Sequence, residues 1–249
     1  MPSVILGFVQ RLRSAIVRNG VAYVVKKTMR TAFHTLRDRL LFRPVVATRD
    51  PNGPRFDREC ALDTQERFTD VQALAEMPSE AVVHGYTYSP SDPDTVRLLV
   101  DKLQIPYEDY AFVDFGSGKG RVLFIAAEYP FRRVVGVEHS GYLHSVAQNN
   151  IAKYSNPKRQ CKDIQSCNID ARSFPLPSGP TVYFFFNPFD SLVLRHVLER
   201  INESLSASPH KDYVVCYHVN DEQLFRAHRA RELWRHSNGF GTHILFELE

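Results

Sequence analysis

The chain has few cysteines, and none are arranged as a metal-binding pair. Its four cysteines, Cys60, Cys161, Cys167 and Cys216, show neither C-x-x-C spacing nor companion histidines at zinc-ligand spacing. This pattern argues against a disulfide framework and against a structural zinc site, so we expect no metal. A reducing compartment is the simplest setting for such a chain.

The sequence also lacks a long apolar run. It has no stretch of about 18 uninterrupted apolar residues, and its N-terminus shows no signal-peptide pattern with a small-residue cleavage site. Internal repeats and low-complexity tracts are absent as well. The lack of an apolar run and of a signal peptide predicts a soluble, intracellular body, and we expect a cytoplasmic protein that could still associate with a membrane.

What the chain does have is enough apolar residues for one large core. It holds 249 residues, of which 43% are hydrophobic, and a second full domain would not fit. From about residue 91 onward, predicted strands and helices alternate, which favours an α/β fold with a doubly wound sheet. We therefore expect one domain over residues 84–249, and residues 44–83, which carry proline and glycine breakers, are predicted to be an irregular connector.

Positive charge is concentrated in the remaining segment, residues 1–43. This segment carries nine Lys and Arg residues against Asp38 alone, whereas the whole chain has a net charge of +3, which leaves −5 for residues 44–249. Apolar residues recur in it at helical spacing, so we predict a basic amphipathic helical segment. It could lie on an anionic membrane, contact a partner or nucleic acid, serve as a presequence, or pack on its own domain.

The most informative stretch is a glycine loop between a strand and a helix. The apolar run Ala111–Phe115 predicts a buried strand, and Gly116, Gly118 and Gly120 follow it where the backbone must approach a ligand closely. A dinucleotide fingerprint would need its third glycine one residue later, and a Walker A loop would need glycine in place of Val113. The loop therefore predicts a nucleotide-type cofactor other than NAD or ATP.

Polar residues follow three further predicted strands. A strand over 133–137 ends at Glu138, near the spacing of ~20 residues at which a carboxylate can take ribose hydroxyls. Another strand runs into Asn168–Ala171, and a fourth, over 181–186, runs into Asn187–Asp190. Any one of these residues alone could be a simple turn residue, but their order along the chain is informative.

The series D-x-G-x-G-x-G, carboxylate and ordered strand ends resembles the class I S-adenosylmethionine-dependent methyltransferases over roughly residues 84–249. The resemblance implies a mostly parallel, doubly wound sheet of seven strands with a C-terminal antiparallel hairpin, preceded by N-terminal helices. The turn Gly239–Gly241 between two β-type runs suits that hairpin. The implied cofactor is S-adenosyl-L-methionine.

The resemblance also implies roles for cofactor-binding residues. Asp114 would support the loop or bind the cofactor amine, and backbone N–H groups of Ser117 to Gly120 would face its methionine end. Glu138 would accept from the ribose and Asp170 from the adenine amino group. Asp170 could equally be a local turn residue, and Tyr88 could equally pack a helix against the sheet. The full predicted set is Tyr88, Asp114, Gly116, Ser117, Gly118, Lys119, Gly120, Glu138, His139, Asp170 and Ala171.

The predicted catalytic segment is Asn187, Pro188 and Phe189. It resembles the N-P-P-[Y/F] signature of amino-group methyltransferases, with one proline missing, and also lysine-directed members of the class. The resemblance implies a nitrogen acceptor, such as a protein lysine side chain. The segment could instead be only the turn that leaves the fourth strand, and an oxygen acceptor would then call for a histidine such as His218.

Three alternatives remain open for the activity. One is a small-molecule or lipid-linked O- or N-methyltransferase at a membrane surface, held there by residues 1–43. Another is a catalytically silent subunit that uses the cofactor fold for binding, although the glycine loop and the ribose carboxylate are both intact. Nucleic acid is a less favoured acceptor because residues 44–249 are net acidic.

Overall fold

The computed structural model describes residues 53–65, 88–218, 221–239 and 241–248. The basic segment 1–43 and most of the predicted connector 44–83 lie outside these ranges. The predicted domain boundaries therefore stay predictions. Residues 53–65 are the described part of the predicted connector.

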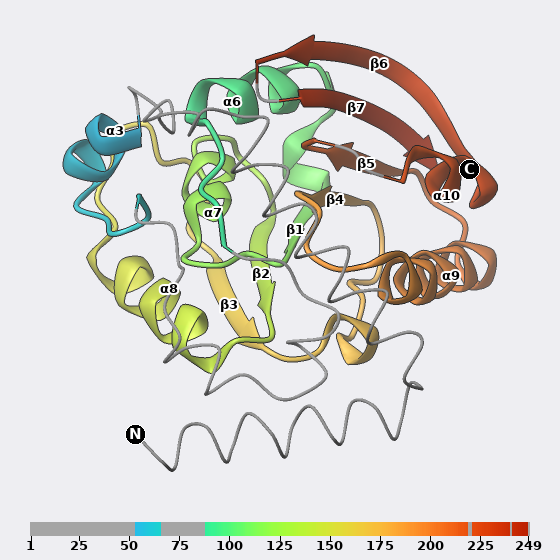
Figure 1. Cartoon of the computed structure of the whole chain (residues 1–249), viewed down its shortest axis with the longest axis horizontal. Helices are drawn as coiled ribbons and strands as arrows, with labels where there is room; N and C mark the ends of the chain where they lie inside the picture. Colours follow the sequence, from blue (N-terminus) through green and yellow to red (C-terminus); the bar gives the residue numbers. More distant parts are fainter. Residues whose placement is uncertain (1–52, 66–87, 219–220, 240, 249) are drawn as a thin grey trace, which may run out of the picture.

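The described residues form one seven-stranded sheet in the order β3-β2-β1-β4-β5-β7-β6 (Figure 1). Strands β1 to β5 pair in parallel, and β7 lies antiparallel to both β5 and β6. This confirms the predicted seven-stranded sheet with its C-terminal hairpin. The insertion of β7 between β5 and β6 also separates it from a dinucleotide-binding sheet, whose usual order is 3-2-1-4-5-6. The strands are β1 Ala111–Phe115, β2 Arg133–Glu138, β3 Ile164–Asn168, β4 Thr181–Phe185, β5 Asp212–Cys216, β6 Ala230–Asn238 and β7 Gly241–Leu248.

Helices cover both faces of the sheet, so the fold is doubly wound as predicted. One hydrophobic core lies between the sheet and α3, α6 and α7, and the other lies between the sheet and α9 and α10. Every residue of β1, β4 and β5 is buried, as expected for strands covered on both faces. The helices are α3 Gly53–Cys60, α6 Pro93–Asp101, α7 Arg121–Ala126, α8 Gly141–Lys153, α9 Ser191–Ala207 and α10 Glu222–Ala227, with short 3₁₀ turns η1 Tyr107–Asp109 and η2 Ala171–Ser173.

Side-chain caps fix where the helices that follow the strands begin. Ser140 accepts from the N–H of Leu143 at the start of α8, directly after β2. Asp190 does the same for the first turn of α9, directly after β4. Because each cap satisfies a backbone donor that the helix leaves free, it sets the point at which the chain turns back. The loops between strand and helix are therefore short, and they gather at the carboxyl edge of the sheet.

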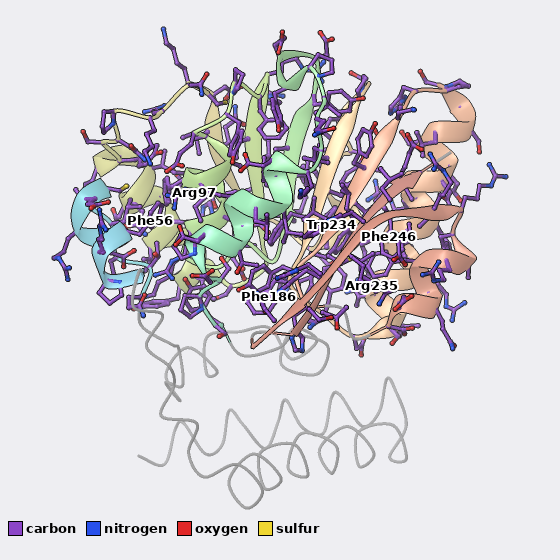
Figure 2. The ribbon with its side chains drawn as sticks, turned by 90° about the horizontal axis from the view of Figure 1, so that it is seen from above. Phe56, Arg97, Phe186, Trp234, Arg235 and Phe246 are labelled. Carbon is purple, nitrogen blue, oxygen red and sulfur yellow. The ribbon has the colours of Figure 1, made fainter. Side chains whose placement is uncertain are left out.

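Helix α3 belongs to the core although it lies in the predicted connector. Phe56 is buried in the same cluster as the residues of α6 and α7. The guanidinium of Arg97 on α6 lies 5.6 Å from the centre of the Phe56 ring, and the two side chains lie next to each other in Figure 2. This part of the connector thus packs against the helices that surround the glycine loop.

The order of the strands reverses at β1. Strand β1 lies between β2 and β4, and Phe115 at the end of β1 pairs with Val137 on one side and Phe185 on the other. In open α/β sheets, ligands bind beyond the carboxyl ends of the strands where the order reverses. The glycine loop after β1 and the Asn187 segment after β4 both leave the sheet at that point.

Candidate cofactor and acceptor site

All three loop glycines adopt left-handed backbone conformations. Their φ angles are 78° at Gly116, 55° at Gly118 and 89° at Gly120, a region that other residues enter only with strain. Space is also restricted: a Cβ on Gly116 would lie 2.3 Å from Pro188, and one on Gly118 would lie 2.3 Å from the ring of Tyr88. Glycine is therefore required at 116 and 118 for both conformation and space.

Glu138 ties the glycine loop to the end of β2. Its Oε2 accepts from the N–H of Gly118 at 2.8 Å, and its Oε1 accepts from the N–H of Ser140 at 2.8 Å. Burial raises the pKa of this carboxyl, while the N–H donors of Ser140 and Gly118 oppose the rise. The sequence placed Glu138 and the loop in one site, and the structure brings them into direct contact.

Backbone donors of the loop form hydrogen bonds within the loop and to the end of β2. The N–H groups of Gly116 and Ser117 donate to the carbonyl of Val137, and the N–H of Gly120 donates to the carbonyl of Ser117. Together with the Gly118 bond to Glu138, these contacts fold the loop back onto the end of β2. The N–H groups of Ser117, Gly118 and Gly120 thus have partners within the chain, and the role of the Ser117 to Gly120 N–H groups toward the cofactor stays a prediction.

Asp114 is a second buried carboxyl beside Glu138. It is 3% exposed near the end of β1. Burial, followed by repulsion from Glu138, raises the pKa of Asp114 well above its ordinary value. A positive charge placed next to the two carboxyls would offset this repulsion.

Lys119 does not offer its charge to the site. The side chain is 3% exposed, and its Nζ lies 3.1 Å from Oδ1 of Asp63. The Lys119 carbonyl in turn accepts from Nδ2 of Asn150 on α8 at 3.0 Å. The sequence gave no signal for Asp63, which lies outside the motif series.

Three further residues of the predicted cofactor-binding set follow β2 and β3: His139, Asp170 and Ala171. Asp170 accepts from the N–H of Arg172 at 2.8 Å and pairs with its guanidinium at 2.6 Å. Burial acts to raise the pKa of Asp170, but the bonds from Arg172 outweigh it, and the pKa is lowered. Within the described residues, Nε2 of His139 is buried without a hydrogen-bond partner, and Ala171 is buried. Asp170 is thus a turn residue with a local partner, and its role toward adenine stays a prediction.

The predicted catalytic segment begins with a left-handed residue that is not glycine. Asn187 has a φ of 42°, a conformation that asparagine tolerates better than most residues. The Phe189 ring packs edge-on against Phe115 and Phe185, at 6.4 Å and 6.3 Å between ring centres. Phe189 is therefore anchored on the core, while Pro188 rests on the glycine loop.

A second strained residue follows the neighbouring strand. His218, just beyond β5, has a φ of 58°. Its N–H donates to Nδ1 of His243 at 3.2 Å, and Nε2 of His243 bonds to Oδ1 of Asn238 at 3.0 Å. Burial, and then the charges of His236 and His218, lower the pKa of His243 to about 4. His243 is therefore neutral near pH 7 and is able to accept from the His218 backbone.

These contacts close into a ring through α6. The Asn238 amide donates to Oγ1 of Thr95 at 3.4 Å, and Thr95 donates to Asp92 at 2.6 Å. The N–H of Asp92 donates to the hydroxyl of Tyr217, the residue before His218, at 3.0 Å. The end of β5, the β6–β7 hairpin and the start of α6 are thus joined by hydrogen bonds.

Solved structures that this chain resembles have little sequence identity to it. Neither a family model nor a curated protein sequence matches the chain. A ribosomal protein L11 methylase from Lactobacillus delbrueckii subsp. bulgaricus is 12% identical, with 76% of this chain and 83% of that chain covered and a TM-score of 0.46. A precorrin-6y C5,15-methyltransferase from Geobacter metallireducens is 12% identical, with 64% and 89% covered and a TM-score of 0.47.

Geranyl diphosphate C-methyltransferase from Streptomyces coelicolor, whose structure contains S-adenosyl-L-homocysteine, is also 12% identical, with 63% and 76% covered and a TM-score of 0.45. The acceptors of these three methyltransferases differ. The chain has the class I methyltransferase fold. The strand order supports the fold, and we base the proposed activity on the residues of the site.

The part of the chain that the structure describes lacks two features, a membrane-spanning helix and a cluster of metal-ligating side chains. No helix there is long and apolar enough to cross a membrane. No group of three or more His, Cys, Asp or Glu side chains there is placed to hold a metal ion.

Proposed function

We propose that this chain is an S-adenosylmethionine-dependent methyltransferase whose acceptor is a nitrogen, such as that of a protein lysine side chain. One observation carries the cofactor assignment: the Glu138 carboxylate lies against the N–H of Gly118 at 2.8 Å. This contact puts an acidic residue after β2 beside the glycine loop after β1, at the point where the strand order reverses. A nucleoside whose ribose hydroxyls donate to a carboxylate suits that place.

The charges of the site support this cofactor over NAD or ATP. A phosphate-bearing nucleotide needs a cation or free N–H groups at the loop. Here the ammonium of Lys119 is paired with Asp63, and the buried carboxyls of Asp114 and Glu138 lie beside the loop. An ammonium or sulfonium group would offset negative charge on those carboxyls, whereas a pyrophosphate would add further negative charge next to them.

When bound, S-adenosylmethionine supplies an activated methyl group, so the protein needs to align the acceptor and exclude water. In this proposal the Asn187 side-chain oxygen accepts a hydrogen bond from the acceptor amine, which points the amine's lone pair at the methyl carbon. Phe189, fixed against Phe115 and Phe185, keeps the Asn187 turn in place. The left-handed conformation of Asn187 supports a functional role, since strained residues gather at such sites.

An oxygen acceptor on a small or lipid-linked molecule is the second candidate, and His218 favours it. This histidine follows β5 as Asn187 follows β4, and His243 fixes its backbone. An imidazole at that strand end could take the proton of a hydroxyl. Residues 1–43 would in either case bring the enzyme to an anionic membrane or a protein partner.

Binding and transfer are tested in sequence. Calorimetry with S-adenosylhomocysteine, S-adenosylmethionine, NAD and ATP is expected to show binding of the first two only. Tighter binding of NAD than of S-adenosylhomocysteine would overturn the cofactor assignment. Radiolabelled cofactor is then incubated with a cell extract that has been separated into protein, lipid, nucleic-acid and small-molecule fractions. Label in protein, stable to base, would support a nitrogen acceptor, whereas label in the lipid or small-molecule fraction would favour the second candidate.

A further inference from the structure

The glycine loop and the first residue of α7 carry two buried cations. Lys119 is 3% exposed and Arg121, at the first position of α7, is 2% exposed. Burying a cation costs free energy unless anions and hydrogen-bond acceptors surround it. The position of these two side chains, and with them the loop, therefore depends on where their partners lie.

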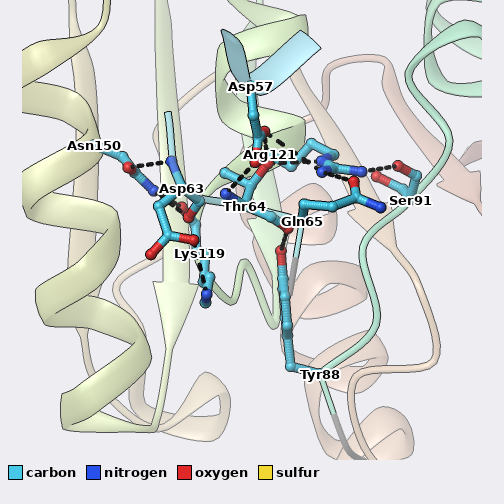
Figure 3. A network of polar contacts seen from close by, with 9 residues as sticks. All are labelled: Asp57, Asp63, Thr64, Gln65, Tyr88, Ser91, Lys119, Arg121 and Asn150. Carbon is cyan, nitrogen blue, oxygen red and sulfur yellow. Dashed lines mark hydrogen bonds and ion pairs between the residues drawn. The ribbon is translucent and has the colours of Figure 1, made fainter. Parts of the chain in front are cut away.

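Their acidic partners come from a segment far away in the sequence. Asp63 pairs with Lys119 at 3.1 Å, and Asp57 lies 3.5 Å from Arg121. The side chains of Thr64 and Gln65 also accept from Arg121, at 2.8 Å and 2.7 Å (Figure 3). Residues 57–65 thus lie across the loop, and their contacts with Lys119 and Arg121 join residues 56 or more positions apart in the chain.

Thr64 joins this segment to the residue that covers the loop. Its carbonyl accepts from the hydroxyl of Tyr88 at 2.8 Å, and the Tyr88 ring lies directly against Gly118. Its hydroxyl donates to Asp57 while accepting from Nε of Arg121. One residue therefore links the cation at the end of the loop to the ring above its middle glycine.

Asn150 fixes the other end of the same segment. Its Oδ1 accepts from the N–H of Asp63, and its Nδ2 donates to the carbonyls of Asp63 and Lys119, each at 3.0 Å. One amide on α8 thus holds the backbones of the segment and of the loop together. A glycine loop is flexible by itself, so contacts of this kind determine how well it is preorganised for a ligand.

We infer that residues 57–65 position the glycine loop for cofactor binding, with Thr64 and Asp57 as positioning residues that act through Arg121 and Tyr88. This inference rests on the proposed function, because it concerns the same cofactor site. It adds a second element to that site which the motif series does not contain. Loss of the Thr64 hydroxyl leaves the Arg121 guanidinium without one acceptor and loosens the link between loop and Tyr88.

The test uses the full-length chain and S-adenosylhomocysteine affinity measured by calorimetry. Thr64→Val, which keeps the shape of the side chain, should weaken binding by about tenfold or more, and Asp57→Asn should act in the same direction. Thr64→Ser keeps the hydroxyl and should bind like wild type. Glu128→Gln is the matched control. It weakens a partly buried ion pair in which Oε2 of Glu128 lies 2.7 Å from Nε of Arg97, and neither residue contacts the segment 57–65 through Arg121 or Tyr88. It should lower the melting temperature while leaving affinity unchanged.

The outcomes separate the inference from the proposed function. If wild type binds no S-adenosyl compound, the proposed function fails and the positioning role falls with it. If wild type binds and folded Thr64→Val binds equally well, only the positioning role is overturned. Hydrogen exchange on wild type covers the case in which the variants do not fold. Added S-adenosylhomocysteine should slow exchange in 57–65 together with 116–121, and unchanged exchange in 57–65 would overturn the inference.

Discussion

A Cβ added to Gly116 would lie 2.3 Å from Cβ of Pro188, so the first glycine of the loop and the proline of the predicted catalytic segment are in direct contact. The two residues follow β1 and β4, which are neighbours in the sheet although 72 positions separate Gly116 from Pro188 in the sequence. The predicted catalytic segment and the loop are therefore packed against each other. The proposed cofactor and acceptor sites form one packed unit at the point where the strand order reverses.

Replacement of Glu138 should weaken cofactor binding. Glu138→Ala removes a carboxylate that would accept from the ribose, and we expect a loss of about 1.5–3 kcal/mol of binding free energy. It also removes the acceptor for the N–H groups of Gly118 and Ser140, so the melting temperature should fall. Calorimetry with S-adenosylhomocysteine measures the first effect. A folded variant with wild-type affinity would remove Glu138 from the site.

Replacement of Asn187 should affect turnover more than cofactor affinity. Glycine is the informative substitution, because it adopts the left-handed φ of 42° without strain while removing the amide. If the amide orients the acceptor, Asn187→Gly should lower kcat roughly 100-fold, which corresponds to about 2.7 kcal/mol. Cofactor affinity should stay near that of wild type. If this variant keeps full activity on the identified acceptor, the segment is a structural turn and His218 becomes the better candidate.

His243 should make the fold less stable as the pH falls. Its pKa in the folded protein is lowered from 6.5 to about 4, so the unfolded chain binds the proton more readily. Stability from this group is present above pH 6.5 and is lost as the pH falls toward 4. The loss at pH 5 should reach up to about 2 kcal/mol.

Urea unfolding at pH 7.5 and pH 5 measures this effect. The matched variant is His243→Gln, whose amide retains an acceptor for the N–H of His218 and a donor for Asn238 but does not titrate. Other groups face His243, namely His218, His236 and Asp92, and both proteins contain them. The pH dependence should therefore be weaker in the variant. Equal pH dependence in the two proteins would show that His243 is not the group responsible.

Removal of residues 1–43 should leave cofactor binding intact. The segment precedes residues 57–65 and the entire motif series, so the truncated chain keeps every contact described for the loop. Calorimetry should give an unchanged affinity for S-adenosylhomocysteine, whereas co-sedimentation with anionic vesicles should decrease. A full-length variant with Arg11, Arg13 and Arg18 changed to Gln tests the charge alone. Loss of cofactor binding on truncation would mean instead that these residues complete the domain.

The sequence by itself determined the fold and most of the strand ends, because both depend on local patterns. The apolar run Ala111–Phe115 and the three glycines each act within a few residues, so β1 and the loop were predicted at or near their observed positions. The spacing from the loop to Glu138 is also a local property of one strand–helix–strand unit.

Only the tertiary structure decided how the loop is held. Lys119 was predicted to face the cofactor through its backbone N–H, and its side-chain ammonium binds Asp63, from the segment that was predicted to be an irregular connector. Tertiary contacts also hold Arg121, whose Nε donates to the Thr64 hydroxyl, and the neutral His243, which accepts from the N–H of His218. These contacts join residues far apart in the sequence, and no local pattern encodes them. They form because a buried cation or imidazole takes whichever partner the folded chain brings within reach.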